Sequence, residues 1–187
     1  MKIIKEDFKL KNEIEGLING QFSGSDIATR FLQRLEKGEL TRDENSKSHL
    51  CAYFAAIDPG AKQVFIGHHK KSGLWLFNGG HIDQGETMHE TVIREIGEEW
   101  GLNGNVFEIN PPSLITITEI NNPTKQKCNL HYDLRHFVSV DKNKFKPLDE
   151  NLLEEFHEAG WKSLEEARSL IADKNTLLAI DFIESKF

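Results

Sequence analysis

The sequence predicts an α+β protein in which helices cover a mixed β-sheet. Two observations support this fold class. Strand-like and helix-like apolar patterns are intermixed along the chain, without the regular alternation of a doubly wound parallel sheet. Residues 1–47 show helical spacing alone. We therefore predict an N-terminal helical extension, residues 1–47, followed by a larger domain, residues 48–187.

Two helices are predicted within the extension. Apolar residues recur there every three or four positions, first at Leu10, Ile14, Leu17 and Ile18, and then at Ile27, Phe31 and Leu35. The segment NGQFSGSD between the two groups is typical of a turn, and Gly38 is a natural stop for the second helix. The polar segment TRDENSKS, residues 41–48, is predicted to connect the extension to the domain.

The domain combines predicted strands and helices. Its strand-like runs cover residues 49–57, 63–68, 113–120, 130–140 and 156–161, with a short apolar piece at 74–77. Helices are predicted at residues 87–100, 164–172 and 176–184. The Gly-rich loop NGGHIDQGE precedes the helix at 87–100, so this loop and this helix are the natural place to look for chemistry.

The helix at 87–100 has signals at both ends. The sequence Thr-Met-His-Glu, starting at Thr87, forms a capping box in which the carboxylate of Glu90 returns to the first residue. Gly101 supplies the left-handed conformation that commonly ends a helix. At 100° per residue, one face of the helix is apolar and must pack on a core; it comprises Val92, Ile93, Ile96 and Trp100.

Three carboxylates gather on another arc of this helix. Glu95, Glu98 and Glu99 lie within five residues, and Arg94 is their only near cation. Like charges at this spacing repel, and acids close to a helix C-terminus oppose the helix dipole. A solvated acidic face is one interpretation. The other is a site for a hard divalent cation such as Mg²⁺, which prefers oxygen ligands and would relieve the repulsion.

The spacing of these residues resembles a known family signature. From Gly80, the chain has five residues, then Glu86, seven residues, and then REIGEEWGL up to Leu102. This resembles the Nudix box, GX5EX7REUXEEXGU with U aliphatic, at every specified position. Seven fixed matches arise by chance at a frequency on the order of 10⁻⁸ per starting point.

The resemblance implies a fold and a reaction. Nudix proteins are typically Mg²⁺-dependent hydrolases of a nucleoside diphosphate linked to another moiety, built as an α/β/α sandwich around a mixed sheet. By resemblance, Glu98 and Glu99 are the principal metal ligands, Glu95 is a further ligand or the base that activates water, and the carbonyl of Gly79 is a backbone ligand. The cofactor expected is Mg²⁺, with Mn²⁺ as a substitute.

Two further box residues receive supporting roles from the resemblance. Arg94 is expected to orient a box glutamate through a charge-assisted hydrogen bond. Glu86 is expected to brace the loop against the helix. One position departs from many relatives, which have Pro-Gly-Gly where this chain has Asn78 before Gly79; the change relaxes the entry to the loop but removes no ligand.

The substrate is less well specified, because the box is shared across substrates. His69, Lys71 and Arg135 are candidates to meet phosphate or base, and Trp75 is a candidate for stacking on a base. A plain surface or core role also fits each of them. A further catalytic glutamate could come from Glu119, Glu150, Glu154 or Glu155.

Three histidines receive a weaker interpretation. His131 and Asp133 share one face of their predicted strand, so they fit either the metal site or the edge of a core. His68 and His69 are adjacent and point to opposite sides of a strand, so no joint zinc site is expected from them.

Composition and charge limit the partners. The net charge of −7 argues against a nucleic-acid polymer and leaves a small nucleotide as the expected substrate. The longest apolar run, residues 50–57, is too short to cross a membrane, and the charged start of the chain lacks the apolar stretch of a signal peptide, so we expect a cytoplasmic protein. The extension could hold a partner or make a homodimer.

These observations lead to one expected function with two alternatives. The expected function is a Mg²⁺-dependent Nudix pyrophosphohydrolase that cleaves a diphosphate linkage in a nucleoside diphosphate derivative. The first alternative is a house-cleaning hydrolase of modified nucleoside triphosphates. The second is a non-catalytic Nudix-fold module that binds nucleotides or regulates a partner, although such modules usually lose box carboxylates that this chain keeps.

Overall fold

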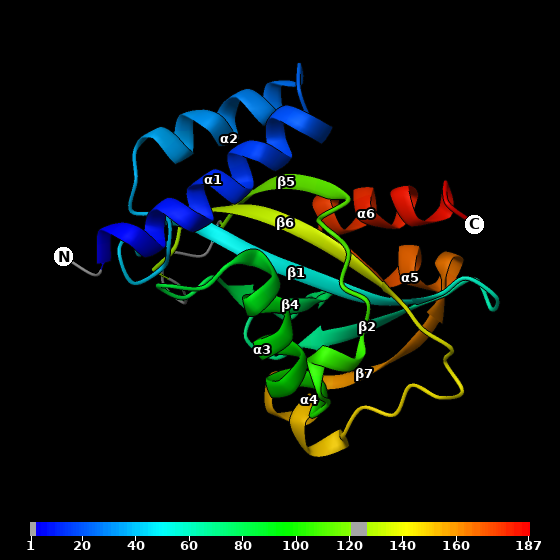
Figure 1. The fold of residues 1–187 in the computed structure, drawn as a ribbon. Helices are drawn as coiled ribbons and strands as arrows, with labels where there is room; N and C mark the ends of the chain where they lie inside the picture. The colour runs from blue at the N-terminus through cyan, green and yellow to red at the C-terminus, as the bar shows by residue number, and fades with distance from the viewer. Residues whose placement is uncertain (1–2, 121–126) are drawn as a thin grey trace. The chain divides into compact units, whose positions relative to one another are not determined.

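The computed structural model describes residues 3–120 and 127–187 (Figure 1). Its helices are α1 (Ile3–Gln21), α2 (Asp26–Glu36), α3 (Met88–Trp100), the short 3₁₀ helix η1 (Gly104–Val106), α4 (Asp149–Glu155), α5 (Leu164–Leu170) and α6 (Lys174–Glu184). Its strands are β1 (Ser48–Asp58), β2 (Gln63–His69), β3 (Trp75–Leu76), β4 (Asn78–His81), β5 (Leu114–Glu119), β6 (Leu130–Ser139) and β7 (Phe156–Ser163).

The strands form one mixed sheet in the order β3-β2-β1-β6-β5, with β4 pairing with β1 and β7 with β2. Strand β2 is antiparallel to β1, β3 and β7. The predicted fold class, a mixed sheet covered by helices, is confirmed. No helix in the described part of the chain combines the length and apolar character needed to cross a bilayer.

Most of the predicted elements are present, and three observed elements were not predicted. These are β4, η1 and α4. The sequence of α4, DENLLEE, lacks an apolar face: Leu152 is buried, whereas its neighbour Leu153 is half exposed. An amphipathic pattern therefore could not reveal this helix. Strand β4 lies inside the Gly-rich loop, where the residue types are typical of turns rather than strands.

The chain forms two compact units, which are described separately. The first contains residues 3–52, 80–91, 115–120 and 127–134. Here α1 and α2 lie side by side (Figure 1). The predicted apolar faces of these helices are buried at Leu10, Ile14 and Ile18 and again at Phe31. The ring of Phe31 meets Tyr132 of β6 edge to face, with centroids 5.2 Å apart, so α2 packs on the start of β6.

A buried cation ties the end of α2 to the beginning of β1. Arg34 is only 3% exposed, and its guanidinium donates hydrogen bonds to the carbonyls of Gly38, Glu39 and Ser48 at 2.7, 2.5 and 2.6 Å. Hydrogen bonds from a charged donor stabilise the folded protein more than neutral ones do, so each carbonyl that lost this donor would lose that stabilisation. Arg34 therefore fixes the turn that leads from the extension into the sheet.

We expect Arg34→Met to lower the free energy of unfolding by about 2–4 kcal/mol, because three backbone carbonyls lose the charged donor that Arg34 provides from a buried position. Urea unfolding followed by circular dichroism measures this change. Arg30→Met on the same helix is the matched control, since Arg30 is exposed, and it should have little effect. Equal effects of the two substitutions would contradict the assigned role.

The second unit contains residues 53–79, 92–114 and 135–187. Its core places helices on both faces of β1. Phe54 meets Trp100 of α3 with ring centroids 4.8 Å apart, whereas the next residue, Ala55, packs with Ala179 and Ile180 of α6. Consecutive strand residues point to opposite faces, so α3 and α6 cover opposite faces of this part of the sheet.

Candidate functional site

Helix α3 is capped as the sequence predicts. The hydroxyl of Thr87 accepts a hydrogen bond from the backbone N–H of Glu90 at 3.2 Å, and the Glu90 carboxylate accepts from the backbone N–H of Thr87 at 2.8 Å. At the other end, Gly101 has φ +65°, in the left-handed region. The capping box and the terminal glycine are thus confirmed, and they fix where the box glutamates lie along the helix.

Burial separates the three carboxylates in the second half of α3. Glu95 and Glu99 are buried at 8% and 7% exposure, whereas the Glu98 side chain is 60% exposed. Arg94 connects the two kinds, because its Nη1 donates to Glu95 Oε1 at 2.8 Å and to Glu98 Oε2 at 3.1 Å. The guanidinium therefore holds an inner and an outer carboxylate close together on one side of α3.

Glu99 is anchored to β4, at the start of the Gly-rich loop. Its Oε2 accepts hydrogen bonds from Asn78 Nδ2 at 2.6 Å and from the Gly79 N–H at 3.1 Å. Burial raises the pKa of Glu99 well above its usual value, and the charges of Glu95 and Glu155 raise it further, against the lowering effect of the two donors. A cation beside Glu99 would reverse this balance and favour the carboxylate.

A fourth carboxylate belongs to this electrostatic group. Glu155 is the last residue of α4, and its charge raises the pKa of Glu99. Its carboxylate lies 3.4 Å from His69 Nε2. The residue that follows β2 holds the end of α4 at this point, since the backbone N–H of Lys70 donates to the Glu155 carbonyl at 2.9 Å. The candidates for an additional catalytic group are Glu119, Glu150, Glu154 and Glu155. Of these, Glu155 contributes to the raised pKa of Glu99.

The predicted substrate residues lie in different surroundings. His69 is next to Glu155, and burial lowers its pKa, against the raising effect of that carboxylate. Trp75 stacks on His68 with ring centroids 5.5 Å apart. Arg135 is buried over the ring of Tyr53, whereas Lys71 is exposed.

In the other unit, Glu86 lies within the Gly-rich loop. Its Oε2 accepts a hydrogen bond from Thr91 Oγ1 on α3 at 2.8 Å and from the Asp83 N–H at 3.3 Å. The contacts join the loop to the first turns of α3. This geometry fits the role expected of Glu86, which is to hold the loop against the helix.

His131 and Asp133, which share one face of β6, have different neighbours. Asp133 Oδ2 accepts hydrogen bonds from the hydroxyls of Thr116 and Thr118 at 2.9 and 2.5 Å. The ring of His131 instead lies 5.0 Å from that of His49 and 5.2 Å from that of His81, centroid to centroid. No sequence pattern revealed this histidine group, because its members are far apart along the chain.

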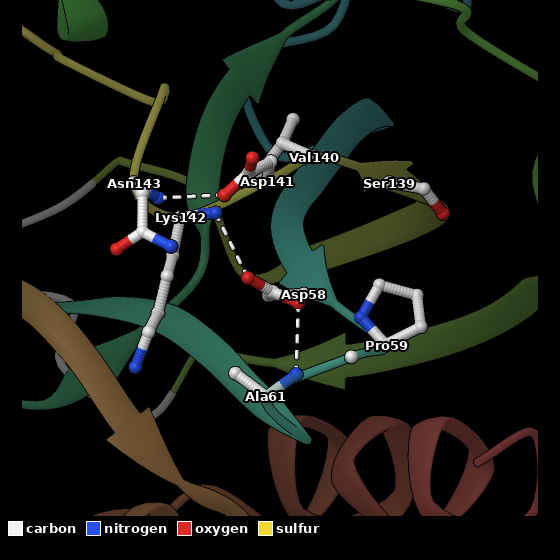
Figure 2. Close-up of a pocket in the computed structure, with 9 residues that line it drawn as sticks. Asp58, Pro59, Ala61, Ser139, Val140, Asp141, Lys142 and Asn143 are labelled. Carbon is white, nitrogen blue, oxygen red and sulfur yellow. Dashed lines mark hydrogen bonds between the residues drawn. The ribbon is translucent and has the colours of Figure 1, made fainter.

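A cavity of about 670 Å³ lies at the turn between β1 and β2 (Figure 2). Asp58 is at its centre and accepts backbone hydrogen bonds from Ala61 and Lys142 at 2.9 and 2.8 Å. These two bonds lower the pKa of Asp58. The lining contains none of the box residues, so we assign this carboxylate to holding the turn rather than to catalysis.

We expect Asn78→Ala to weaken binding of a divalent cation by about 10- to 100-fold, since residues that orient a ligand typically contribute this much. The substitution removes the 2.6 Å donor to Glu99 and leaves the carboxylates in place. Titration calorimetry with Mn²⁺ measures the affinity. Asn143→Ala, at an exposed position, is the control. Wild-type affinity in Asn78→Ala would show that this donor does not orient Glu99 for binding.

Comparison with known proteins gives concordant matches. The model of the NUDIX domain family matches residues 47–180. An uncharacterized Nudix hydrolase from Rhodococcus erythropolis is 31% identical over 124 residues, covering 60% of this chain and 63% of that protein, so the match spans less than two thirds of the relative. A nucleoside triphosphatase from Enterobacter sp. is 27% identical over 109 residues, covering 57% of this chain and 73% of that protein.

The solved structures extend the comparison to the fold. The E. coli dihydroneopterin triphosphate pyrophosphohydrolase superposes with a TM-score of 0.62 at 14% identity, over 73% of this chain and 95% of that one. At this identity the likeness concerns the arrangement of helices and strands.

Proposed function

Because the chain belongs to the Nudix family, we propose that it is a Mg²⁺-dependent pyrophosphohydrolase that cleaves the diphosphate linkage of a nucleoside diphosphate derivative. The observation that carries this proposal is the buried Glu99, whose pKa is raised beside Glu95 and Glu155. Burying an acid beside another carboxylate costs free energy, and a bound cation would offset this cost.

The donor set fits a hard divalent cation. Glu95, Glu98 and Glu99 offer carboxylate oxygens, and Gly79 offers its carbonyl; Mg²⁺ prefers oxygen donors, and Mn²⁺ accepts the same set. When bound, the cation supplies positive charge that offsets the charge of the diphosphate. We assign these four residues as the ones that hold it.

The remaining residues of this proposed site act on the carboxylates and on water. Arg94 keeps Glu95 and Glu98 at hydrogen-bond distance from one guanidinium, which fixes their orientation. Glu95 serves as a ligand or as the base that takes a proton from the attacking water. Glu155 is the second candidate for this base, because it lies beside His69 and acts on Glu99.

Substrate contacts are proposed for His69, Lys71, Arg135 and Trp75. The first three would meet phosphate or base, and Trp75 would stack on a base, as aromatic rings commonly do. Glu86 is proposed to hold the loop in the shape that the reaction requires, through its contact with Thr91.

One second candidate has specific support. Similarity to a nucleoside triphosphatase favours a nucleoside triphosphate as the molecule whose anhydride is cleaved, including modified ones. A non-catalytic module has less support, because Glu95, Glu98 and Glu99 are all retained.

The surroundings of the reaction are part of the proposal. The net charge of −7 supports a small nucleotide rather than a nucleic-acid polymer as the partner. A cytoplasmic location agrees with the nucleotide substrate. We further propose that residues 1–47 form a helical extension and residues 48–187 the catalytic domain, with the extension as the surface offered to a partner or a second copy.

The experiment is a substrate panel. Nucleoside triphosphates, dinucleoside polyphosphates and nucleotide sugars are each incubated with the protein and Mg²⁺, and phosphate and nucleotide products are separated by chromatography. We expect a nucleoside monophosphate and a second phosphorylated product from at least one compound. Binding of a nucleotide without turnover of any compound would instead support the non-catalytic module.

A further inference from the structure

Three histidines and a cysteine meet in the first unit. Ligand atoms of His49, Cys51, His81 and His131 all lie within 4.8 Å of one another. Cys51 and His49 are fully buried, and His131 is 5% exposed. The three rings form a compact triangle, with centroid distances of 4.7 Å for His49–His81, 5.0 Å for His49–His131 and 5.2 Å for His81–His131.

The sheet explains how these residues converge. His49 and Cys51 are two positions apart on β1, so their side chains share one face. His81 ends β4, which pairs with β1, and His131 is on β6, the neighbour of β1 in the sheet order. Three strands therefore bring four metal-ligating side chains together, although 82 positions separate His49 from His131 along the chain.

His49 is oriented as a metal ligand would be. Its Nδ1 lies 2.8 Å from the carbonyl of Asn45. A carbonyl only accepts, so Nδ1 carries the proton and Nε2 presents a lone pair. Among the described residues, this buried Nε2 has no hydrogen-bond partner. A backbone carbonyl that fixes the tautomer of a ligating imidazole is a common arrangement around metals.

The other groups are compatible with coordination. Burial lowers the pKa of His49 and of His131 to about 4, so both rings are neutral at neutral pH, the form in which histidine binds metals. Arg42 lies 3.3 Å from His81 Nδ1, and its guanidinium only donates. Arg42 is exposed, so its side chain can turn toward solvent when His81 coordinates a cation.

We propose that His49, Cys51, His81 and His131 form a site for a tetrahedrally coordinated transition-metal ion of the Zn²⁺ class. Nitrogen and thiolate donors select such borderline-soft ions, whereas the oxygen donors proposed for the reaction select Mg²⁺. Four protein ligands fill a tetrahedral shell, which is typical of structural zinc sites. Tetrahedral ligands are about 3.3–3.8 Å apart, so small side-chain rotations close the site.

The site would have a structural effect on the Gly-rich loop. His81 lies within this loop, where β4 ends, and its neighbour Ile82 already donates a backbone hydrogen bond to the Leu50 carbonyl of β1 at 3.2 Å. A metal ion shared by β1, β4 and β6 would fix the loop on the sheet at His81. The ion therefore stabilises the shape of the loop and takes no part in the reaction itself.

The experiment measures zinc binding by equilibrium dialysis and elemental analysis, with excess Mg²⁺ to fill oxygen sites. We expect one Zn²⁺ per chain. Cys51→Ser and His49→Gln should lower the affinity by at least about 100-fold, because each removes a ligand. Cys128→Ser is the matched control, since Cys128 is the other buried cysteine. Glu98→Gln tests whether the ion is held by the acidic site instead, and both controls should bind zinc normally.

A second measurement uses the wild-type protein alone and does not depend on the folding of variants. Co²⁺ replaces zinc and is expected to show the strong visible bands of tetrahedral coordination together with ultraviolet charge transfer from the thiolate. The absence of zinc binding, an octahedral cobalt spectrum without charge transfer, unchanged affinity in Cys51→Ser, or loss of zinc in Glu98→Gln would each overturn the proposal.

Discussion

Glu98→Gln is expected to lower kcat/KM by about 10²- to 10⁴-fold, which corresponds to about 3–5 kcal/mol of transition-state stabilisation. Glu98 is more exposed than Glu95 and Glu99, so it can reach a cation shared with a substrate. The substitution keeps the shape of the side chain and removes only its charge. Steady-state kinetics on a compound identified by the substrate panel measures the effect.

Stability should change little in the same variant. The ion pair between Glu98 and Arg94 is exposed on the Glu98 side, and such pairs contribute about 0–1 kcal/mol. Loss of activity with an unchanged Tm therefore separates a functional carboxylate from a structural one. Glu165→Gln, an exposed glutamate on α5, is the control and should keep full activity. Full activity in Glu98→Gln would show that this residue is not a required ligand.

Glu99→Gln is expected to affect stability and metal response in opposite directions. In EDTA at neutral pH, the variant should melt a few degrees above the wild type, because it no longer buries an acid beside Glu95 and Glu155. A gain on the order of 1 kcal/mol raises Tm by about 2–4 °C in a chain of this size. With Mg²⁺, the wild type should gain stability through binding, and the variant should not.

The pH dependence of this difference follows from the direction of the pKa shift. The folded protein raises the pKa of Glu99, so it binds a proton that the unfolded chain has already lost above about pH 4. The wild type therefore loses stability as pH rises through the unfolded pKa toward the folded one. The advantage of Glu99→Gln in EDTA should be present at pH 7 and should vanish near pH 4. Scanning calorimetry at both values tests this, and a wild type that melts higher in EDTA at pH 7 would contradict it.

The sequence predicts local features of this protein well. Thr87 and Glu90 cap α3, and Gly101 ends it, because capping depends on residues within one turn of each other. The grouping of Glu95 and Glu99 also follows from helical spacing alone. Their burial does not, since it depends on what packs around α3.

The features that the sequence did not reveal depend on distant parts of the chain. Asn78 donates to Glu99 because β4 lies against α3. The presence of Asn78 where many relatives have proline does not by itself predict this hydrogen bond. The sequence does not distinguish Glu155 from Glu150 and Glu154, because α4 lacks an apolar face that would predict it. The position of α4 places Glu155 next to His69. His49 meets His131 only through the pairing of the sheet.

Phosphorus NMR provides the most direct test that this chain hydrolyses a phosphoric anhydride with the carboxylates of α3. A compound selected by the panel is incubated with the protein, first in EDTA and then with Mg²⁺. We expect the resonances of the P–O–P linkage to persist in EDTA and to be replaced by those of two phosphate-ester or phosphate products with Mg²⁺, in the wild type and not in Glu98→Gln. Unchanged P–O–P resonances for every nucleotide that the protein binds in the presence of Mg²⁺ would contradict the proposed function.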